Sequence, residues 1–173
     1  MTPVRVDIRK DLPLVHGRPI YRRNDLGLIY DVAETASPIE DDNLSAMIDQ
    51  QFGIREPGNL FVQADTLTLV FRAQGGVFVS LDAYTNCDRW QRSTEALPPV
   101  GAGSGALTLT ERVESDRISF AILPQYRFNS EASTLSIVLG GRATHYFEVG
   151  DDIFVGVASG ILTEVVLTNL IIT

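Results

Sequence analysis

The chain has 173 residues, a formal net charge of −8 and a single cysteine. A chain of this length can form one domain that buries about 70% of its unfolded surface, and one cysteine excludes an intrachain disulfide. The negative charge opposes nucleic-acid binding. The N-terminal residues contain no apolar segment of the signal-peptide type, so we expect the chain to be made and folded in the cytoplasm.

Residues 1–26 are predicted to form an extended arm. Residues 9–26 contain two prolines and a glycine and lack a sustained apolar period, although a short strand over 4–8 can precede them. The first 25 residues hold six basic and three acidic side chains, opposite in sign to the rest of the chain. The segment is therefore either solvated or docked on an acidic surface. The candidate docking residues are Arg5, Arg9, Arg18, Arg22 and Arg23.

Residues 37–52 carry the pattern of one short helix. Ser37 can cap its start, Pro38 falls at the first helical position, and Glu40 stands at the capping-box spacing. The apolar side chains that follow recur on one helical face, and Gly53 ends the pattern. The helix dipole accounts for the acidic residues of the first turn without a metal.

From residue 58 onward, short runs of apolar and β-branched residues alternate with turn residues. The predicted strands are 28–32, 59–64, 66–73, 76–84, 106–113, 117–128, 134–139, 144–149, 153–158 and 161–172. Regularly spaced strands without intervening helices are typical of a sandwich or jelly roll. We therefore expect residues 27–173 to form a single, mainly β domain, an antiparallel β-sandwich that includes the helix.

Residues 151–173 are the most apolar stretch of the chain. A membrane-spanning helix needs about 20 apolar residues in succession, whereas Glu164 interrupts this stretch, so we expect no membrane span. Two strands that turn at Ser159 and Gly160 fit the composition better. Alternation along the last strand puts Asn169 on the side that suits an intrachain core less well. That side is the candidate oligomer interface, formed by Val165, Leu167, Asn169 and Ile171.

The longest predicted loop, residues 85–105, contains the only tryptophan of the chain. An aromatic ring beside hydrogen-bonding side chains can hold a sugar. The candidate glycan contacts are Tyr84, Asn86, Asp88, Arg89, Trp90, Gln91 and Arg92. The alternative is that Trp90 closes one end of the core.

The sequence contains no catalytic or cofactor signature. His16 and His145 lack ligand-type neighbours at metal-binding spacing, and Cys87 lacks a nearby base. The glycine-rich run at 101–106 lacks the P-loop ending, and the acidic turn at 148–152 lacks EF-hand spacing. We therefore expect no enzyme activity, no cofactor and no metal, with a carboxylate-based enzyme as the weakest of three alternatives.

Residues 133–173 resemble the C-terminal end of TNF/C1q-type jelly rolls. The matching features are the Gly150-Asp151 turn, the alternating Ile153, Val155 and Val157, and the apolar ending at 170–172. The resemblance implies a trimer whose terminal strands lie near the threefold axis. Such modules occur in bacteriophage particles and fibres as well as in secreted ligands.

Two function classes stand ahead of the enzyme. The first expectation is a structural protein, a subunit of a symmetric homo-oligomeric particle such as a phage virion, in contact with neighbouring particle proteins. The second is a carbohydrate-binding module that uses the Trp90 loop. Because fold alone does not choose between them, the mass in solution and glycan binding are the discriminating observations.

Overall fold

The computed structural model describes residues 3–33, 58–98, 102–110 and 115–173. The helix predicted at 37–52 lies outside these residues. Within the described ranges, no helix has the length and apolar character needed to cross a membrane.

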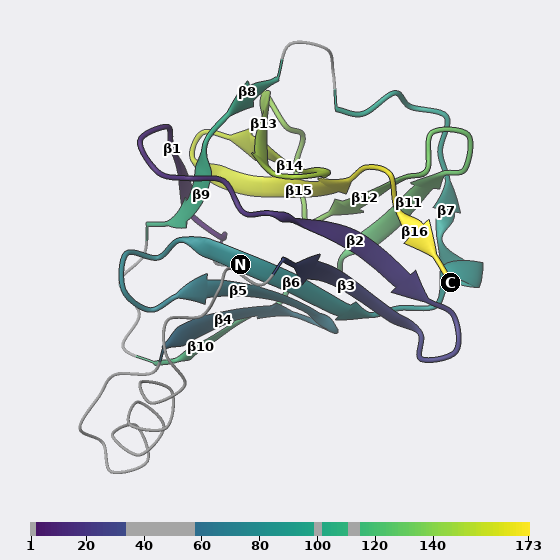
Figure 1. The fold of residues 1–173 in the computed structure, drawn as a ribbon, viewed down its shortest axis with the longest axis horizontal. Helices are drawn as coiled ribbons and strands as arrows, with labels where there is room; N and C mark the ends of the chain where they lie inside the picture. Colours follow the sequence, from purple (N-terminus) through teal and green to yellow (C-terminus); the bar gives the residue numbers. More distant parts are fainter. Residues whose placement is uncertain (1–2, 34–57, 99–101, 111–114) are drawn as a thin grey trace.

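Two seven-stranded sheets stack face to face (Figure 1). The first sheet has the order β10-β4-β5-β6-β3-β2-β16, and the second has the order β7-β11-β12-β15-β14-β13-β8. The mainly β sandwich expected from the sequence is therefore confirmed. In the first sheet the strands are β2 (Gly17–Arg22), β3 (Gly27–Val32), β4 (Asn59–Ala64), β5 (Leu67–Arg72), β6 (Phe78–Tyr84), β10 (Arg117–Phe120) and β16 (Ile171–Ile172). In the second they are β7 (Gln91–Arg92), β8 (Gly103–Ser104), β11 (Gln125–Asn129), β12 (Thr134–Val138), β13 (His145–Gly150), β14 (Ile153–Ala158) and β15 (Ile161–Leu167).

A two-stranded ribbon joins the two sheets along one side. It pairs β1 (Val6–Arg9) with β9 (Ala106–Leu109) in antiparallel register. Isolated bridges connect the ribbon's surroundings to each sheet, from Arg5 to Ile161 and from Thr108 to Val77. The one short 3-10 helix in the described residues, η1 (Cys87–Arg89), leads from β6 to β7.

The core lies between the two sheets and is filled by alternate residues of the central strands. Leu69 and Phe71 of β5 face Leu135 and Ile137 of the second sheet within one cluster of buried side chains. Alternation along a strand sends every second side chain to this interior. Full burial of a side chain of this size contributes about 1.5–3 kcal/mol, so these central strands hold the sandwich together.

The N-terminal segment is woven into the fold, which corrects the expectation of an extended arm. β1 pairs with β9, and β2 lies between β3 and β16 inside the first sheet. Tyr21 of β2 is fully buried, and its hydroxyl donates to the carbonyl of Thr85 at 2.9 Å. The sequence was misleading because Pro19 interrupts the strand pattern. However, β16 pairs only with Ile20 and Tyr21, so Pro19 occupies an unpaired part of that edge, where a missing N–H is tolerated.

Two of the predicted strands are each divided between the two sheets. The run at 117–128 forms β10 at the edge of the first sheet and β11 in the second, with Pro124 in the crossing segment. The run at 161–172 forms β15 and β16, and between them Asn169 takes a positive φ of 50°. A left-handed residue turns the chain out of the strand direction, and this turn carries the C-terminus across to β2.

The predicted oligomer interface is wrong as a single surface. Val165 and Leu167 belong to the core between the sheets and are buried there. Asn169 donates through its side-chain amide to Asp152 Oδ1 at 2.7 Å, and Ile171 lies in the other sheet, partly exposed. Alternation failed beyond Leu167 because β15 ends there.

Candidate functional site

The outer face of the second sheet carries a row of side chains in register across four strands. Tyr146 of β13 pairs with Gly156 of β14, and Gly156 pairs with Glu164 of β15. Glu164 pairs in turn with Val138 of β12. Because paired residues point to the same face of a sheet, Tyr146, Glu164 and Val138 share the face opposite the core.

Glu164 is a buried carboxylate held by two hydroxyl donors. Only 7% of its surface is exposed. Ser136 Oγ donates to its Oε1, and Tyr146 Oη donates to its Oε2 at 2.6 Å. A buried charge is costly unless it is paired and hydrogen-bonded. Here the hydrogen bonds come from neutral groups, and Glu164 has no ion pair with any described residue.

Gly156 makes the contact between Tyr146 and Glu164 possible. A Cβ at this position would lie 3.2 Å from Tyr146 Cε1 and 2.7 Å from the Cβ of Ala143. The tyrosine ring therefore lies across a strand position that has no side chain, and its hydroxyl reaches the next strand. Glycine in a strand interior often marks such a close approach.

The Tyr146 hydroxyl is strongly perturbed by this environment. Desolvation raises its pKa above the usual value near 10, and the hydrogen bond and negative charge of Glu164 raise the pKa further. Glu95 acts in the same direction, whereas Arg142 lowers the pKa. Both Glu95 and Arg142 are therefore within electrostatic range of the Tyr146 hydroxyl.

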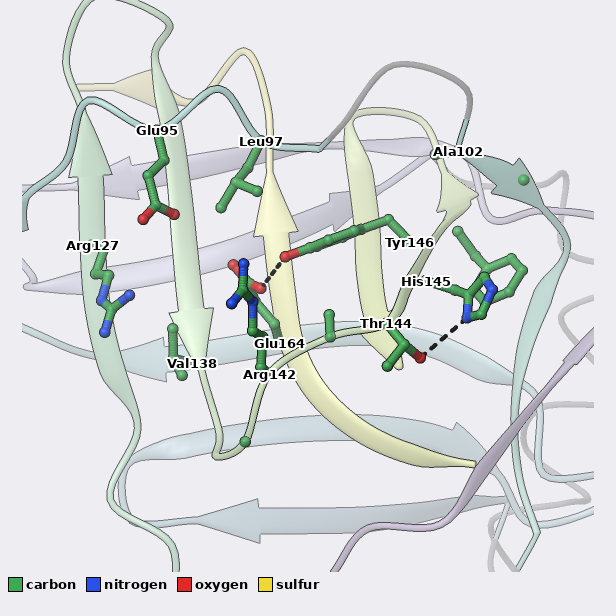
Figure 2. A pocket seen from close by; sticks show the side chains of 14 residues that line it. Glu95, Leu97, Ala102, Arg127, Val138, Arg142, Thr144, His145, Tyr146 and Glu164 are labelled. Carbon is green, nitrogen blue, oxygen red and sulfur yellow. Dashed lines mark hydrogen bonds between the residues drawn. The ribbon is translucent and has the colours of Figure 1, made fainter. Parts of the chain in front are cut away.

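A strap, defined as residues 93–98, leaves β7 at one edge of the sheet and lies over this face (Figure 2). Asn129 Nδ2 of β11 donates to the carbonyl of Glu95 at 3.2 Å and ties the strap to the sheet. Leu97 projects from the strap toward the sheet (Figure 2). Val166 on this face is fully buried without belonging to the inter-sheet core.

A cavity of about 870 Å³ opens beside the strap, above the Glu164 row (Figure 2). Two acidic and two basic side chains line it, together with His145, Thr144 and Tyr146; the four charged ones are Glu95, Glu164, Arg127 and Arg142. None of these four forms an ion pair with another described residue. The cavity thus presents charges of both signs that form no ion pair among the described residues.

Trp90 packs largely into the core rather than standing free in its loop. Trp90 is 9% exposed, and its indole N–H donates to Thr85 Oγ1 at 2.9 Å. Its ring packs at 4.7 Å from the Tyr21 ring and at 6.4 Å from the Tyr126 ring, measured between centroids. Trp90 therefore packs into one end of the core, the alternative considered above, and it also lines a cavity.

Four of the seven predicted glycan contacts line one cavity of about 560 Å³, namely Asp88, Trp90, Gln91 and Arg92. Asn86 caps η1 by accepting from the backbone N–H of Asp88, and Tyr84 is exposed at the end of β6. Cys87 and Phe128 also line this cavity, which shares no lining residue with the cavity above Glu164. Tyr84 and Arg89 do not line it.

The predicted docking arginines are also dispersed. Arg9 forms a bidentate pair with Asp11, with a shortest N–O distance of 2.6 Å, and Arg18 lies 3.8 Å from Asp31. Arg5 bridges to Ile161, and Arg22 and Arg23 lie at the end of β2. They are set along β1, β2 and the turns around them rather than on a free arm.

Of the two histidines, only His145 enters the cavity. Its Nδ1 lies 3.1 Å from Thr144 Oγ1, while His16 pairs with Asp151 at 3.1 Å elsewhere on the surface. Within the described ranges, no group of three or more His, Cys, Asp or Glu side chains is arranged to hold a metal ion.

The sequence did not reveal Glu164, Tyr146, Ser136 and Gly156 as one site. One signal was available, because Glu164 is the single acidic residue within the apolar run at 153–173. A carboxylate in such a run has to be exposed, paired or functional. Its partners could not be found without the strand register, since Ser136 and Tyr146 lie 28 and 18 residues away.

No protein-family model matches this chain, and no curated protein matches its sequence. The resemblance to TNF/C1q-type jelly rolls therefore stays a prediction. Function has to be inferred from the cavity and from the surfaces around it.

Proposed function

We propose that this chain is a non-catalytic binding protein that holds a hydroxyl-rich, carbohydrate-like ligand in the cavity above Glu164. The observation that carries the proposal is the set of four unpaired charges, Glu95, Glu164, Arg127 and Arg142, facing one cavity. A sugar hydroxyl both donates and accepts hydrogen bonds. A ring of hydroxyls can therefore satisfy carboxylates and guanidinium groups together.

The dimensions and polarity of the cavity agree with this class of ligand. A volume of about 870 Å³ lies within the range of roughly 300–1,000 Å³ common for ligand pockets. The lining also offers the hydroxyl of Thr144 and the ring of Tyr146. These features support a carbohydrate site on the outer face of the second sheet.

Binding without chemistry fits the way the acidic group is held. Both carboxylate oxygens of Glu164 already accept hydroxyl hydrogen bonds, which favours a fixed acceptor over a free nucleophile. His145 has Thr144 Oγ1 as its nearby polar partner and no paired carboxylate. The proposal therefore includes no enzyme activity.

A glycan microarray probed with the labelled full chain tests this function. Binding to at least one hydroxyl-rich glycan is expected, with loss of that signal in Glu164→Gln. Asp82→Asn is the matched control, because Asp82 is an exposed carboxylate on β6 of the other sheet. Equal binding by Glu164→Gln, or no glycan signal from the native chain, would contradict the proposal.

A second candidate is the structural role, a subunit of a symmetric assembly such as a virion. Its support is one exposed apolar region. Leu123 is 79% exposed, and the preceding Ile122 lines an apolar depression of about 340 Å³ with Leu139, Ala158 and Ile161. Large exposed apolar patches mark interaction surfaces. Val165 and Leu167 are buried in the core, so the terminal strand offers no such surface at these two positions.

Sedimentation of the native chain and of Leu123→Asp tests the structural role. An assembly built through this region is expected to dissociate to folded monomers in the variant, since a charge there would be desolvated in the contact. A native chain that stays monomeric at all concentrations would remove this candidate and leave the binding function in place.

A further inference from the structure

The hydrogen-bonding groups of the cavity are unequally satisfied. Each carboxylate oxygen of Glu164 already accepts a hydroxyl hydrogen bond. The guanidinium groups of Arg127 and Arg142 make no side-chain hydrogen bond or ion pair with any described residue. Each guanidinium carries five N–H donors in a planar fork. The groups in the cavity that lack hydrogen-bond partners are therefore mainly the N–H donors of the two arginines. A negatively charged acceptor would bind them best.

The two arginines reach the cavity from different elements. Arg127 lies on β11, in register with Ser136, the donor to Glu164. Arg142 lies on the connection between β12 and β13, and its side chain extends toward Glu164 and Tyr146 (Figure 2). An anion that enters the cavity can thus contact the guanidinium group of Arg127 from the sheet and that of Arg142 from the loop, with Glu164 beneath both.

Glu95 completes a formal charge balance of zero with Glu164, Arg127 and Arg142, but neither carboxylate forms an ion pair with either guanidinium group. Glu95 projects from the strap into the same cavity (Figure 2) and is exposed. An exposed carboxylate is well solvated and interacts weakly over distance, whereas Glu164 is already bonded. A ligand that combines one carboxylate with several hydroxyls therefore matches the cavity better than a neutral or a basic sugar.

We infer that the ligand is a sugar acid, a uronate whose carboxylate binds the guanidinium groups of Arg127 and Arg142 while its hydroxyls bond Glu164. The inference rests on the proposed carbohydrate-binding function and narrows it to one chemical class. Planar guanidinium–carboxylate pairs give charge-assisted, bidentate hydrogen bonds, which distinguish an acid from its ester.

Isothermal titration calorimetry with trigalacturonate and its methyl ester tests the inference on the full chain. The two ligands share their sugar rings and hydroxyls and differ in the charge of the carboxylates and in the methyl groups that the ester adds. The acid is expected to bind at least about tenfold more tightly than the ester, as hydrogen bonds to charged groups imply. The double variant Arg127→Gln with Arg142→Gln should remove that difference. Arg72→Gln is the control, because Arg72 is an exposed arginine on β5 of the other sheet.

The outcomes separate this inference from the function on which it rests. Equal or tighter binding of the ester, or of a glucosamine trimer, would overturn the sugar-acid assignment and keep a carbohydrate site. Retention of the acid preference in the folded double variant would also overturn it, as would failure of trigalacturonate to bind a chain that binds neutral glycans. Absence of binding to every sugar would instead remove the proposed function itself.

Discussion

The indole of Trp90 packs against aromatic rings that come from both sheets. Tyr21 belongs to β2 of the first sheet, and Tyr126 and Phe128 belong to β11 of the second. The indole N–H is satisfied by Thr85, so nothing polar on this side chain awaits a ligand. One residue thus ties together the two sheets at the end where β7 begins.

Replacing Trp90 by alanine is expected to destabilise the chain by about 3–5 kcal/mol, the range for large-to-small changes of a buried aromatic residue. The loss would come from the contacts with Tyr21 and Tyr126 and from the cavity left behind. Urea unfolding followed by circular dichroism measures it. A cost below about 1 kcal/mol would show that the ring does not connect the sheets.

Tyr126 provides a prediction with a defined pH dependence. Its hydroxyl is buried without a hydrogen-bond partner among the described residues, and desolvation raises its pKa to about 12. The unfolded chain ionises near pH 10, so the stabilising effect of this tyrosine's raised pKa is complete below about pH 10 and is lost as pH rises to about 12. Tyr126→Phe is expected to be neutral or stabilising at neutral pH.

Chemical unfolding of Tyr126→Phe and of the native chain across that alkaline range gives the test. The variant should lose less stability at high pH than the native chain. Part of the alkaline loss of stability remains, because the pKa values of Tyr30 and Tyr146 are also raised. A variant that is less stable at neutral pH and equally sensitive to alkali would mean that the hydroxyl has a partner.

At the scale of the strands, the candidate site depends on one register. Tyr146, Gly156 and Glu164 are aligned across β13, β14 and β15. Thr163 is the extra residue at the bulge in β15, and its hydroxyl donates to the carbonyl of Gly156 at 3.0 Å. The bulge thereby fixes which face of the sheet Glu164 occupies.

Gly156→Ala is expected to displace the Tyr146 ring and break its hydrogen bond to Glu164. The added methyl group would lie 2.7 Å from the Cβ of Ala143 and 3.2 Å from Tyr146, and such overpacking costs about 1–3 kcal/mol. A displaced, solvated Tyr146 should regain a pKa near 10. Spectrophotometric titration of the tyrosines would show one more group ionising in that range.

Gly27→Ala is the control for this change, because its nearest neighbour to a new Cβ is the Cβ of Asp25 at 3.8 Å. The control should leave the tyrosine titration as in the native chain. If Gly156→Ala also leaves it unchanged, Gly156 has no part in positioning Tyr146.

Period-two patterns predicted most strands because alternation directly reports one buried face. The bounds at 59–64 and 153–158 agree with β4 and β14. The pattern failed where the chain passes from one sheet to the other, at Pro124 and Asn169, since apolar residues continue through both crossings. It also failed at β2, because Pro19 suggests the end of a strand. The strand continues through Pro19, which has no partner on β16.

For the whole molecule, the two ends of the chain stabilise one another. β2 and β16 pair in parallel, and the backbone N–H groups of Arg23 and Thr173 donate across that pair. β2 separates β16 from the rest of the first sheet. Because β2 links β16 to the rest of the first sheet, the stability of the fold depends on the N-terminal residues as well as on the central strands.

Deletion of residues 1–22 is therefore expected to abolish cooperative thermal unfolding rather than to release a dispensable arm. The truncated chain loses β1 and β2, exposes Leu28 and Trp90, and leaves β16 without a partner. Differential scanning calorimetry on both chains makes the comparison. A truncated chain that still melts cooperatively near the native temperature would restore the extended-arm interpretation.

The candidate site was less predictable than the fold for a physical reason. Each of its groups has an ordinary role when considered singly, as with Glu164 and Arg127 in strands and Arg142 in a connection. Their relation exists only through cross-strand register and the strap, both of which are long-range features. Local sequence patterns carry no information on such pairings.

The most direct measurement of the central claim is an NMR titration of the isotope-labelled full chain with neutral, acidic and basic oligosaccharides. Saturable amide shifts are predicted around the Glu164 cavity, at Glu95, Arg142 and Tyr146, with no change at Val62 or Asp82 in the first sheet. Absence of saturable shifts with all three sugar classes, or shifts confined to the first sheet, would contradict a ligand site above Glu164.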